Sequence, residues 1–303
     1  MKLLDLIFAA RPMLHLPSWS IFLVALHYHH QLSGQYFSLQ DLFILVGITL
    51  MTAGAMYLNQ VFDVASDEIN RKLGFISRGD LRERDMMAAF LTASLAGSVI
   101  GGFISFVTLG IFVQAFALAW IYSVPPFRLK DRAFSGMLAN GWAFGWLISF
   151  AVMPEINLNN AGLLGWDNPF YFFYVVAAVH CLTTIPDRVG DRATGKMTVA
   201  VVLGSRITYS LAALFYLLAL VTALLSGFIP LAVLAGIALA LIGVNLLGGE
   251  RIPATMAAKI PILLLTLLAG TFYPAFLVFI IVLVWLTRVY YRRRFNMVYP
   301  SLT

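Results

Sequence analysis

Two stretches of the sequence place carboxylates four residues apart at the end of long apolar runs. The first, NQVFDVASDEINR (residues 59–71), contains Asn59, Asp63 and Asp67. On an α-helix this spacing keeps the three side chains within an arc of about 80° and advances each by about 6 Å, so they form one polar stripe. A carboxylate costs roughly 2.5 to 3.5 kcal/mol at the centre of a membrane helix and less near the interface. Solvation at a helix end would explain this motif if it stood alone.

The second stretch, TTIPDRVGDRATGK (residues 183–196), ends another apolar run with Asp187 and Asp191. Each of these aspartates lies 124 positions after an aspartate of the first motif. We therefore expect two related halves of four helices each, which bring both aspartate pairs to one face of the membrane. Four carboxylates gathered at one face of the membrane would repel one another strongly unless a positive group lay between them.

The donor set of these motifs favours Mg²⁺, because carboxylate and amide oxygens occur without nearby histidine or cysteine. Mg²⁺ usually keeps several waters and completes its coordination with substrate phosphate oxygens. Basic residues in three loops at the same expected face can bind such a phosphate. They are Arg71, Lys72, Arg78, Arg128, Lys130, Arg192 and Lys196. The ordinary excess of basic residues in cytoplasmic loops explains part of this set, but the whole pattern predicts a metal-diphosphate site.

The composition determines the elements that must position these residues. Of the 303 residues 61% are hydrophobic and 11% are charged, which leaves too little polar surface to cover a soluble globule. We predict an all-α, polytopic membrane helical bundle in which residues 1–303 form a single integral-membrane domain, and we expect no nucleic-acid partner. Cys181 is the only cysteine, which excludes an internal disulfide and a CxxC site.

Apolar runs of roughly 20 residues indicate about nine transmembrane helices. The first four and the next four would form the related halves, and the ninth would be additional. We place them at residues 13–32, 40–62, 87–107, 109–125, 135–153, 168–186, 208–227, 229–248 and 260–287.

The basic residues predict how these helices are oriented. Lys and Arg precede the first helix and follow the second, fourth, sixth and eighth, whereas the other connections contain none. The positive-inside rule therefore places the N-terminus and both aspartate motifs on the cytoplasmic side of the cell membrane. Nine helices leave a basic tail on the opposite side, so either that tail is a tolerated exception or the count near the C-terminus is off by one. Its basic residues are Arg288, Arg292, Arg293 and Arg294.

The motifs together resemble those of the UbiA superfamily of intramembrane prenyltransferases. That family carries NxxxDxxxD after the second helix, a YSxPP-like motif after the fourth and DxxxD after the sixth. Here the three read Asn59/Asp63/Asp67, YSVPPFRLK from Tyr122 to Lys130, and Asp187/Asp191. The likeness covers about residues 11–206 by motif. Many members follow the first motif with an Arg-Pro pair, which this chain replaces with NRKLGFISRGDL, so Arg71 and Arg78 become the candidates for diphosphate contact in that loop.

The resemblance implies an enzyme that transfers a polyprenyl group from an allylic diphosphate, such as geranyl or geranylgeranyl diphosphate, to a lipophilic acceptor within the bilayer. It also implies two Mg²⁺ ions bound by both aspartate pairs, with Asn59 beside them, and ionisation of the donor to an allylic carbocation. Tyr122 can face that cation through its ring, although an aromatic residue near a membrane interface is often only an anchor.

The acceptor is open at this point. An aromatic quinone precursor is the first expectation, and a glycerol-phosphate ether lipid is the second. A membrane cation transporter that uses the aspartate pairs is the alternative from another functional class, because acidic residues in repeated membrane helices also line ion pathways.

Overall fold

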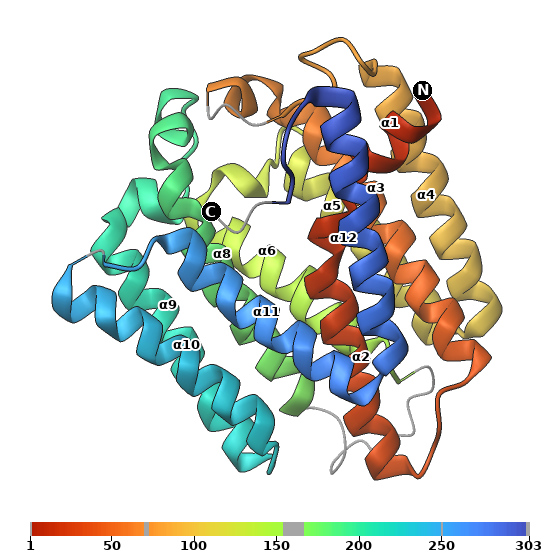
Figure 1. Ribbon diagram of the computed structural model, residues 1–303, viewed down its shortest axis with the longest axis vertical. Helices are drawn as coiled ribbons and strands as arrows, with labels where there is room; N and C mark the ends of the chain where they lie inside the picture. The colour runs from red at the N-terminus through yellow and green to blue at the C-terminus, as the bar shows by residue number, and fades with distance from the viewer. Residues whose placement is uncertain (1, 70–72, 154–166, 250, 301–303) are drawn as a thin grey trace.

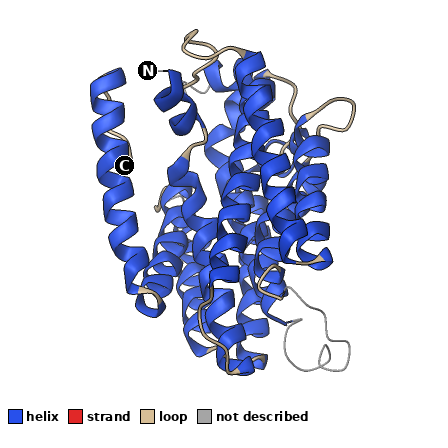
Figure 2. Cartoon of the chain, turned by 90° about the vertical axis from the view of Figure 1, so that its right-hand side faces the viewer, coloured by secondary structure: helices blue, strands red, loops and turns tan. Residues whose placement is uncertain are grey.

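The computed structural model describes residues 2–69, 73–153, 167–249 and 251–300. Within these residues the chain is almost entirely helical and contains no strand (Figure 2). Figure 1 shows the helices packed side by side along a common direction, with the N-terminal helix, the α3–α4 connection and the C-terminal end of α12 together at the top of the view. The all-α helical bundle predicted from composition is confirmed.

The helical elements follow one another with short connections. They are α1 (Lys2–Ala9), η1 (Pro12–His15), α2 (Leu16–Ser33), α3 (Leu39–Ile69), α4 (Glu83–Ile104), α5 (Phe106–Ser123), η2 (Leu129–Asp131), α6 (Ala133–Asn140), η3 (Gly141–Leu147), α7 (Ile148–Phe150), α8 (Asp167–Ala193), α9 (Val199–Leu225), α10 (Ile229–Gly248), α11 (Ala254–Phe272) and α12 (Pro274–Phe295).

Nine helical stretches of the described chain are long and apolar enough to cross a membrane, so the protein is an integral, multi-pass membrane protein. They are Lys2–Ser33, Leu39–Ala65, Glu83–Ile104, Phe106–Ser123, Pro169–Ala193, Val199–Leu225, Ile229–Gly248, Ala254–Phe272 and Pro274–Phe295. The number agrees with the prediction, and seven predicted helices each overlap one of these spans. The two differences lie at residues 135–153 and 260–287.

The helix predicted at 135–153 is present as three consecutive segments. The α-helix α6 continues into η3, a wider π-helical stretch, and then into α7, with right-handed helical backbone at both junctions. Two glycines let this run approach α8 closely: a Cβ added at Gly145 would lie 2.5 Å from the carbonyl oxygen of Phe172, and one added at Gly141 would lie 3.0 Å from the ring of Phe173. Small residues at such contacts allow membrane helices to pack backbone against backbone.

The single helix predicted at 260–287 is wrong, because the chain forms two helices there. Tyr273 has a non-helical backbone conformation (φ −129°, ψ 82°), and Pro274 opens α12. A proline disfavours helical backbone at the residue before it and cannot donate the hydrogen bond that would continue a helix. The chain therefore starts a new helix at this point, so the predicted number of helices near the C-terminus is one too low.

The C-terminal end of α12 lies against the N-terminal segment and the α3–α4 connection. Arg294 bonds Asp5 through its Nε at 3.0 Å and Asp80 through its Nη2 at 2.6 Å. Tyr290 donates a hydrogen bond to Asp5 Oδ1 at 2.6 Å, and its ring stacks on Phe8 at 3.8 Å between centroids. This contact, which we call the Arg294 clamp, joins α1, the connection before α4 and α12 at one face of the bundle.

The cores of the bundle follow the helix contacts. A large cluster of buried apolar side chains contains residues of α2, α3, α5, η3, α8, α9, α10 and α11. A smaller cluster contains residues of α1, α3, α4 and the end of α12. Because α3 contributes to both clusters and also touches α8, it is held on several sides. The last turns of α3 and α8, which carry the aspartate motifs, therefore start from rigidly packed helices.

Candidate active site

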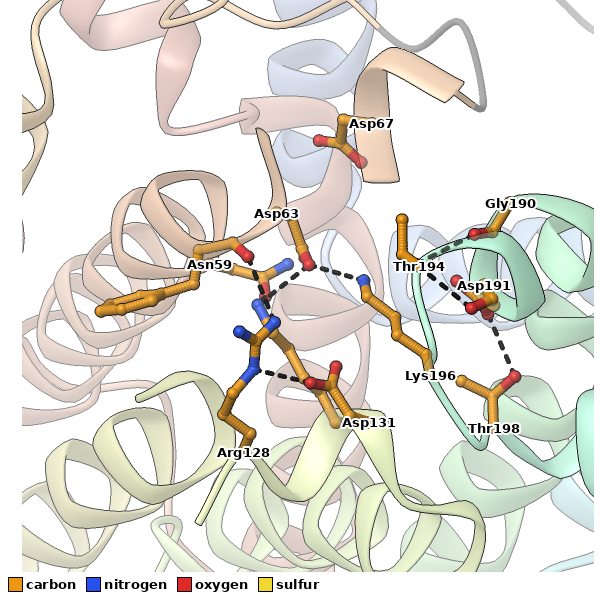
Figure 3. A network of polar contacts seen from close by, with 12 residues as sticks. Asn59, Asp63, Asp67, Arg128, Asp131, Gly190, Asp191, Thr194, Lys196 and Thr198 are labelled. Atoms are coloured by element: carbon orange, nitrogen blue, oxygen red, sulfur yellow. Dashed lines mark hydrogen bonds and ion pairs between the residues drawn. The ribbon is translucent and has the colours of Figure 1, made fainter. Parts of the chain in front are cut away.

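The stripe of Asn59, Asp63 and Asp67 lies within the last three turns of α3, as the four-residue spacing predicts. Asp63 and Asp67 are both buried, at 8% and 9% exposure. Two ammonium groups contact the same carboxylate oxygen, Asp63 Oδ1: that of Lys130 at 3.0 Å and that of Lys196 at 2.7 Å. Figure 3 shows Lys196 reaching Asp63 from the side of α8. The positive charge that the buried carboxylate requires is thus supplied by the chain itself.

Lys130 also donates a hydrogen bond to the amide oxygen of Asn59 at 2.9 Å. Its side chain is only 5% exposed, so it is among the most buried cations of the described chain. Burial lowers the pKa of Lys130 below the ordinary lysine value, and the neighbouring carboxylate of Asp63 offsets part of that shift by favouring the charged ammonium. Asn59, Asp63, Lys130 and Lys196 form what we call the Asp63 cluster.

The two lysines come from loops that are far apart in the sequence and adjacent in space. Lys130 lies in η2, after α5, and Lys196 lies in the loop between α8 and α9. The backbone N–H of Met197 donates to the carbonyl oxygen of Asp131 at 2.7 Å, and Arg132 pairs with Met197 in an isolated parallel bridge. This short backbone contact fixes the two loops to each other, and therefore both lysines relative to Asp63.

Asp67 has a different cation. The guanidinium of Arg11 donates to Asp67 Oδ2 at 3.2 Å. Arg11 joins α1 to η1 with a left-handed backbone (φ 54°), a conformation that non-glycine residues seldom adopt. The sequence shows that Arg11 is positively charged, but it does not indicate Asp67 as the partner, because the two residues lie 56 positions apart.

The second motif lies in the last turns of α8, with Asp191 buried and Asp187 half-buried. The hydroxyl of Thr198 donates to Asp191 Oδ2 at 3.0 Å, and the N–H of Lys196 donates to the carbonyl oxygen of Asp191 at 2.9 Å. Figure 3 shows Asp191 across the same space from Asp63 and Asp67. The structure therefore brings the two motifs to one end of the bundle, as the sequence predicts.

Two other basic residues named as diphosphate ligands pair with aspartates outside the two motifs. Arg128 lies beside the Asp63 cluster (Figure 3), where it bonds Asp131 at 2.6 Å and donates to the carbonyl oxygen of Phe62 at 3.5 Å. Arg78, 49% exposed, bonds Asp80 at 3.2 Å and lies over the ring of Phe295. The side chain of Arg192 is exposed. Arg71 and Lys72 lie outside the described residues. Of the seven predicted phosphate ligands, the structure thus places Lys130 and Lys196 at the buried carboxylate.

A cavity of about 140 Å³ adjoins the Asp63 cluster and is lined by α3, α5, α6, η3 and α7. Its polar lining is concentrated at the end nearest the cluster, where Asn59, Tyr122 and Asn140 lie. The side-chain amide of Asn140 donates to the hydroxyl oxygen of Tyr122 at 2.8 Å. The opposite end is lined by apolar residues, among them Ile48 and Phe112. One end of this cavity therefore suits a charged group and the other an apolar chain.

The aspartates do not form a metal cage on their own. Within the described parts of the chain, no three side chains of histidine, cysteine, aspartate or glutamate lie together as metal ligands. This arrangement fits Mg²⁺, which commonly takes one or two carboxylates and fills its other positions with water and substrate phosphate. The oxygen-only donors of the two motifs match that preference.

The sequence matches that of a known family along most of its length. A profile of the UbiA prenyltransferase family matches residues 17–249. The chain is 28% identical over 170 residues to the probable homogentisate phytyltransferase 2, chloroplastic, of Oryza sativa subsp. japonica, covering 53% of this chain and 45% of that protein. It is 30% identical over 186 residues to the digeranylgeranylglyceryl phosphate synthase of Methanothermobacter thermautotrophicus, covering 59% and 62% of the two chains. The matched region spans less than half of the plant relatives' length.

Solved structures share the fold. A UbiA homolog from Archaeoglobus fulgidus bound to DMAPP and Mg²⁺ superimposes with a TM-score of 0.70 at 15% identity, covering 89% of this chain and 98% of that one. The apo structure of a UbiA homolog from Aeropyrum pernix K1 gives a TM-score of 0.62 at 16% identity, covering 81% and 94%. At these identities the likeness concerns the arrangement of the helices.

Proposed function

The chain belongs to the UbiA prenyltransferase family, and from that premise we propose that it transfers a prenyl group from an allylic diphosphate to a lipophilic acceptor. The observation that carries this proposal is the cavity between α3 and α5. Its walls are largely apolar, and its polar end leads through Asn59 and Lys130 to the carboxylate of Asp63. A prenyl diphosphate has one apolar and one charged part, and the site offers a matching surface to each.

The chemistry requires charge stabilisation and exclusion of water. Breaking the allylic C–O bond sends the bonding electrons to the diphosphate and leaves a carbocation on the prenyl group. Lys130, Lys196 and Arg11 already hold positive charge at the mouth, and groups fixed before the reaction stabilise developing charge without reorganisation. The apolar walls protect the cation from water. The acceptor then forms a bond to the prenyl carbon and releases a proton.

Tyr122 is the residue that we assign to the cation. It lies at the polar end of the cavity, and Asn140 fixes its hydroxyl. An aromatic face attracts a cation within about 6 Å of its centroid. A ring held in this way can stabilise the allylic cation without reacting with it.

The residues proposed to hold Mg²⁺ are Asp63 and Asp67, with Asn59 beside them, for one ion, and Asp187 and Asp191 for a second. When bound, Mg²⁺ neutralises the diphosphate and stabilises it as a leaving group. The ammonium groups of Lys130 and Lys196 lie at the same mouth and are the proposed direct phosphate contacts. Arg78, Arg128 and Arg192 remain proposed ligands with less support, since Arg78 and Arg128 pair with Asp80 and Asp131 and the side chain of Arg192 is exposed. Arg71 and Lys72 remain proposed ligands that lie outside the described residues.

Two classes of acceptor are proposed, because the relatives differ in this respect. The plant relatives are named for prenyl transfer to homogentisate and to an acylphloroglucinol, both of which are aromatic. The archaeal relatives are named digeranylgeranylglyceryl phosphate synthase. An aromatic acceptor is the first candidate, and a glycerol-phosphate ether lipid is the second.

The position of the site favours a cytoplasmic mouth. Arg128, Lys130, Lys196 and the Arg294 clamp all lie at the end of the bundle that carries the aspartates. Cytoplasmic loops are enriched in such residues. We therefore propose that the protein resides in the cell membrane with this end toward the cytoplasm.

The experiment is an assay of the purified protein in detergent with geranyl or geranylgeranyl diphosphate and a panel of aromatic and glycerol-phosphate acceptors, with and without Mg²⁺. We expect Mg²⁺-dependent release of diphosphate and a prenylated product detected by mass spectrometry. The same assay on Asp63→Asn and Asp187→Asn should give neither. A cation transporter would release no diphosphate and would instead support ion flux in proteoliposomes, and that result would overturn the proposal.

A further inference from the structure

Phe112 lies at the apolar end of the cavity. Its side chain lines the cavity and is only 2% exposed, so the ring forms part of the wall. One edge of the ring packs against two glycines: a Cβ added at Gly47 in α3 would overlap it, and one added at Gly101 in α4 would lie 2.8 Å from its Cδ2. Because neither helix leaves room for an outward shift, the position of the ring is set by the backbones of α3 and α4.

The polarity of the cavity determines how a donor enters. Asn59, Tyr122 and Asn140 lie at the end beside the Asp63 cluster, whereas Phe112, Ile111 and Ile148 lie at the other end. A diphosphate would bind at the end beside the cations of the Asp63 cluster, because an unpaired charge among apolar walls costs several kcal/mol. The first carbons of the prenyl chain therefore lie near Tyr122, and the last methyl groups point toward Phe112.

The depth of the cavity follows from helix geometry. Tyr122 and Phe112 are ten positions apart on α5, and Asn59 and Ile48 are eleven positions apart on α3. Each pair spans about 15 to 17 Å along its helix. An extended chain advances roughly 1.2 Å per backbone bond, so an isoprene unit of four bonds spans roughly 5 Å. About three isoprene units fill the distance from Tyr122 to Phe112.

We propose that Phe112 is a specificity-determining residue that limits the donor to about three isoprene units. This inference rests on the proposed function, and it adds the length of the prenyl chain and the residue that sets it. A fourth unit would meet the ring of Phe112, whose outer edge already packs against Gly47 and Gly101. Removing the ring opens space toward those glycines and allows a longer chain to extend.

The test compares donors of two, three and four isoprene units as geranyl, farnesyl and geranylgeranyl diphosphate, measured as kcat/KM for diphosphate release by the purified protein. For the wild type we expect geranylgeranyl diphosphate to be used at least tenfold less well than farnesyl diphosphate. Phe112→Ala should raise the ratio of geranylgeranyl to farnesyl use at least tenfold, and Phe112→Leu should give an intermediate ratio. The leucine variant retains an apolar side chain and so keeps the test valid if the alanine variant folds poorly.

Phe116→Ala is the matched control. Phe116 lies one turn further along α5, stacks on Phe90 at 5.3 Å between centroids and is absent from the cavity lining, so its loss should leave the donor ratio unchanged. An unchanged ratio in both Phe112 variants, or an equal change in Phe116→Ala, would overturn the role of Phe112. Absence of diphosphate release from every donor in the wild type would instead overturn the proposed function, so the two failures are distinguishable.

Discussion

The ends of α3 and α8 carry the same aspartate spacing in different surroundings. Asp63, on α3, is contacted by two buried lysines from two separate loops, and Asp67 is contacted by Arg11 from the N-terminal segment. On α8, Asp191 accepts a hydrogen bond from Thr198 of the loop that follows it, and Asp187 is only half-buried. The repeated motif therefore does not produce a symmetric site.

The contacts of the first motif depend on two loops that are far apart in the sequence. Lys130 comes from the loop after α5 and Lys196 from the loop after α8, and a backbone contact between Asp131 and Met197 joins the two loops. A carboxylate compensated from two directions is fixed in position before any ligand binds. Asp63 is thus held by two separate loops, and the second motif faces it across the same end of the bundle.

The largest expected difference between the two motifs appears when one aspartate is removed from each. Asp63→Ala and Asp187→Ala should each lower turnover by about 10² to 10³-fold, because both remove charge that organises the leaving group. Only Asp63→Ala should also destabilise the fold strongly, by about 3 to 5 kcal/mol, because it leaves two buried ammonium groups without their carboxylate. Turnover and melting temperature in detergent measure the two effects. An equal fall in melting temperature for both variants would show that the asymmetry is unimportant.

A lysine of the Asp63 cluster provides a second test of the same site. Lys130→Met keeps the length of the side chain and removes its charge, so Asn59 and Asp63 both lose their contact. We expect kcat/KM for the prenyl diphosphate to fall by roughly 10 to 100-fold, the range seen when residues that orient metal ligands are lost. Arg251→Ala is the control, because Arg251 is exposed and its side chain donates to the backbone carbonyl of Gly248. Loss of activity in the control equal to that in Lys130→Met would remove the special role of the cluster.

The Arg294 clamp sharpens the comparison, because it contacts the N-terminal segment that carries Arg11, the partner of Asp67. It holds α1, which leads directly to Arg11 and hence to Asp67. Arg294→Ala should lower the melting temperature less than Asp63→Ala does, and it should raise the KM for the donor more than it changes kcat. Arg293→Ala, which removes an exposed neighbour, should change neither. Identical behaviour of the two arginine variants would mean that the clamp does not stabilise this end of the bundle.

The smallest expected effect concerns pH. Burial lowers the pKa of Lys130 in the folded protein below its value of about 10.5 in an unfolded chain. Between the lowered pKa of the folded state and the pKa of the unfolded state, the unfolded chain binds more protons. The contribution of Lys130 to the free energy of unfolding therefore rises as the pH increases through this window. Lys130→Met should remove that rise, whereas Lys259→Met, at an exposed lysine, should retain it. Melting curves measured from neutral pH upward test this, and identical slopes in all three proteins would contradict it.

The sequence was sufficient for features that depend on near neighbours in the chain. Hydropathy predicted most of the spans, and the spacing of four residues predicted that each aspartate pair lies on one face at a helix end. The offset of 124 positions predicted that both motifs reach the same end of the bundle. The break at Tyr273 was missed because an apolar stretch continues through it, although Pro274 was a local signal that a helix starts there.

Only the tertiary structure decided which cations accompany the aspartates. The sequence offered seven basic residues and favoured Arg71 and Arg78 in the first loop, yet Lys130 and Lys196 reach Asp63, while Arg78 and Arg128 bind other aspartates. Arg11 and Asn140 were missed altogether, since nothing in their own segments indicates the partner. Helical periodicity and hydropathy are local properties and can be read along the chain. Pairing of buried charges depends on which loops the packed helices bring within about 3 Å, and that is determined by contacts between residues far apart in sequence.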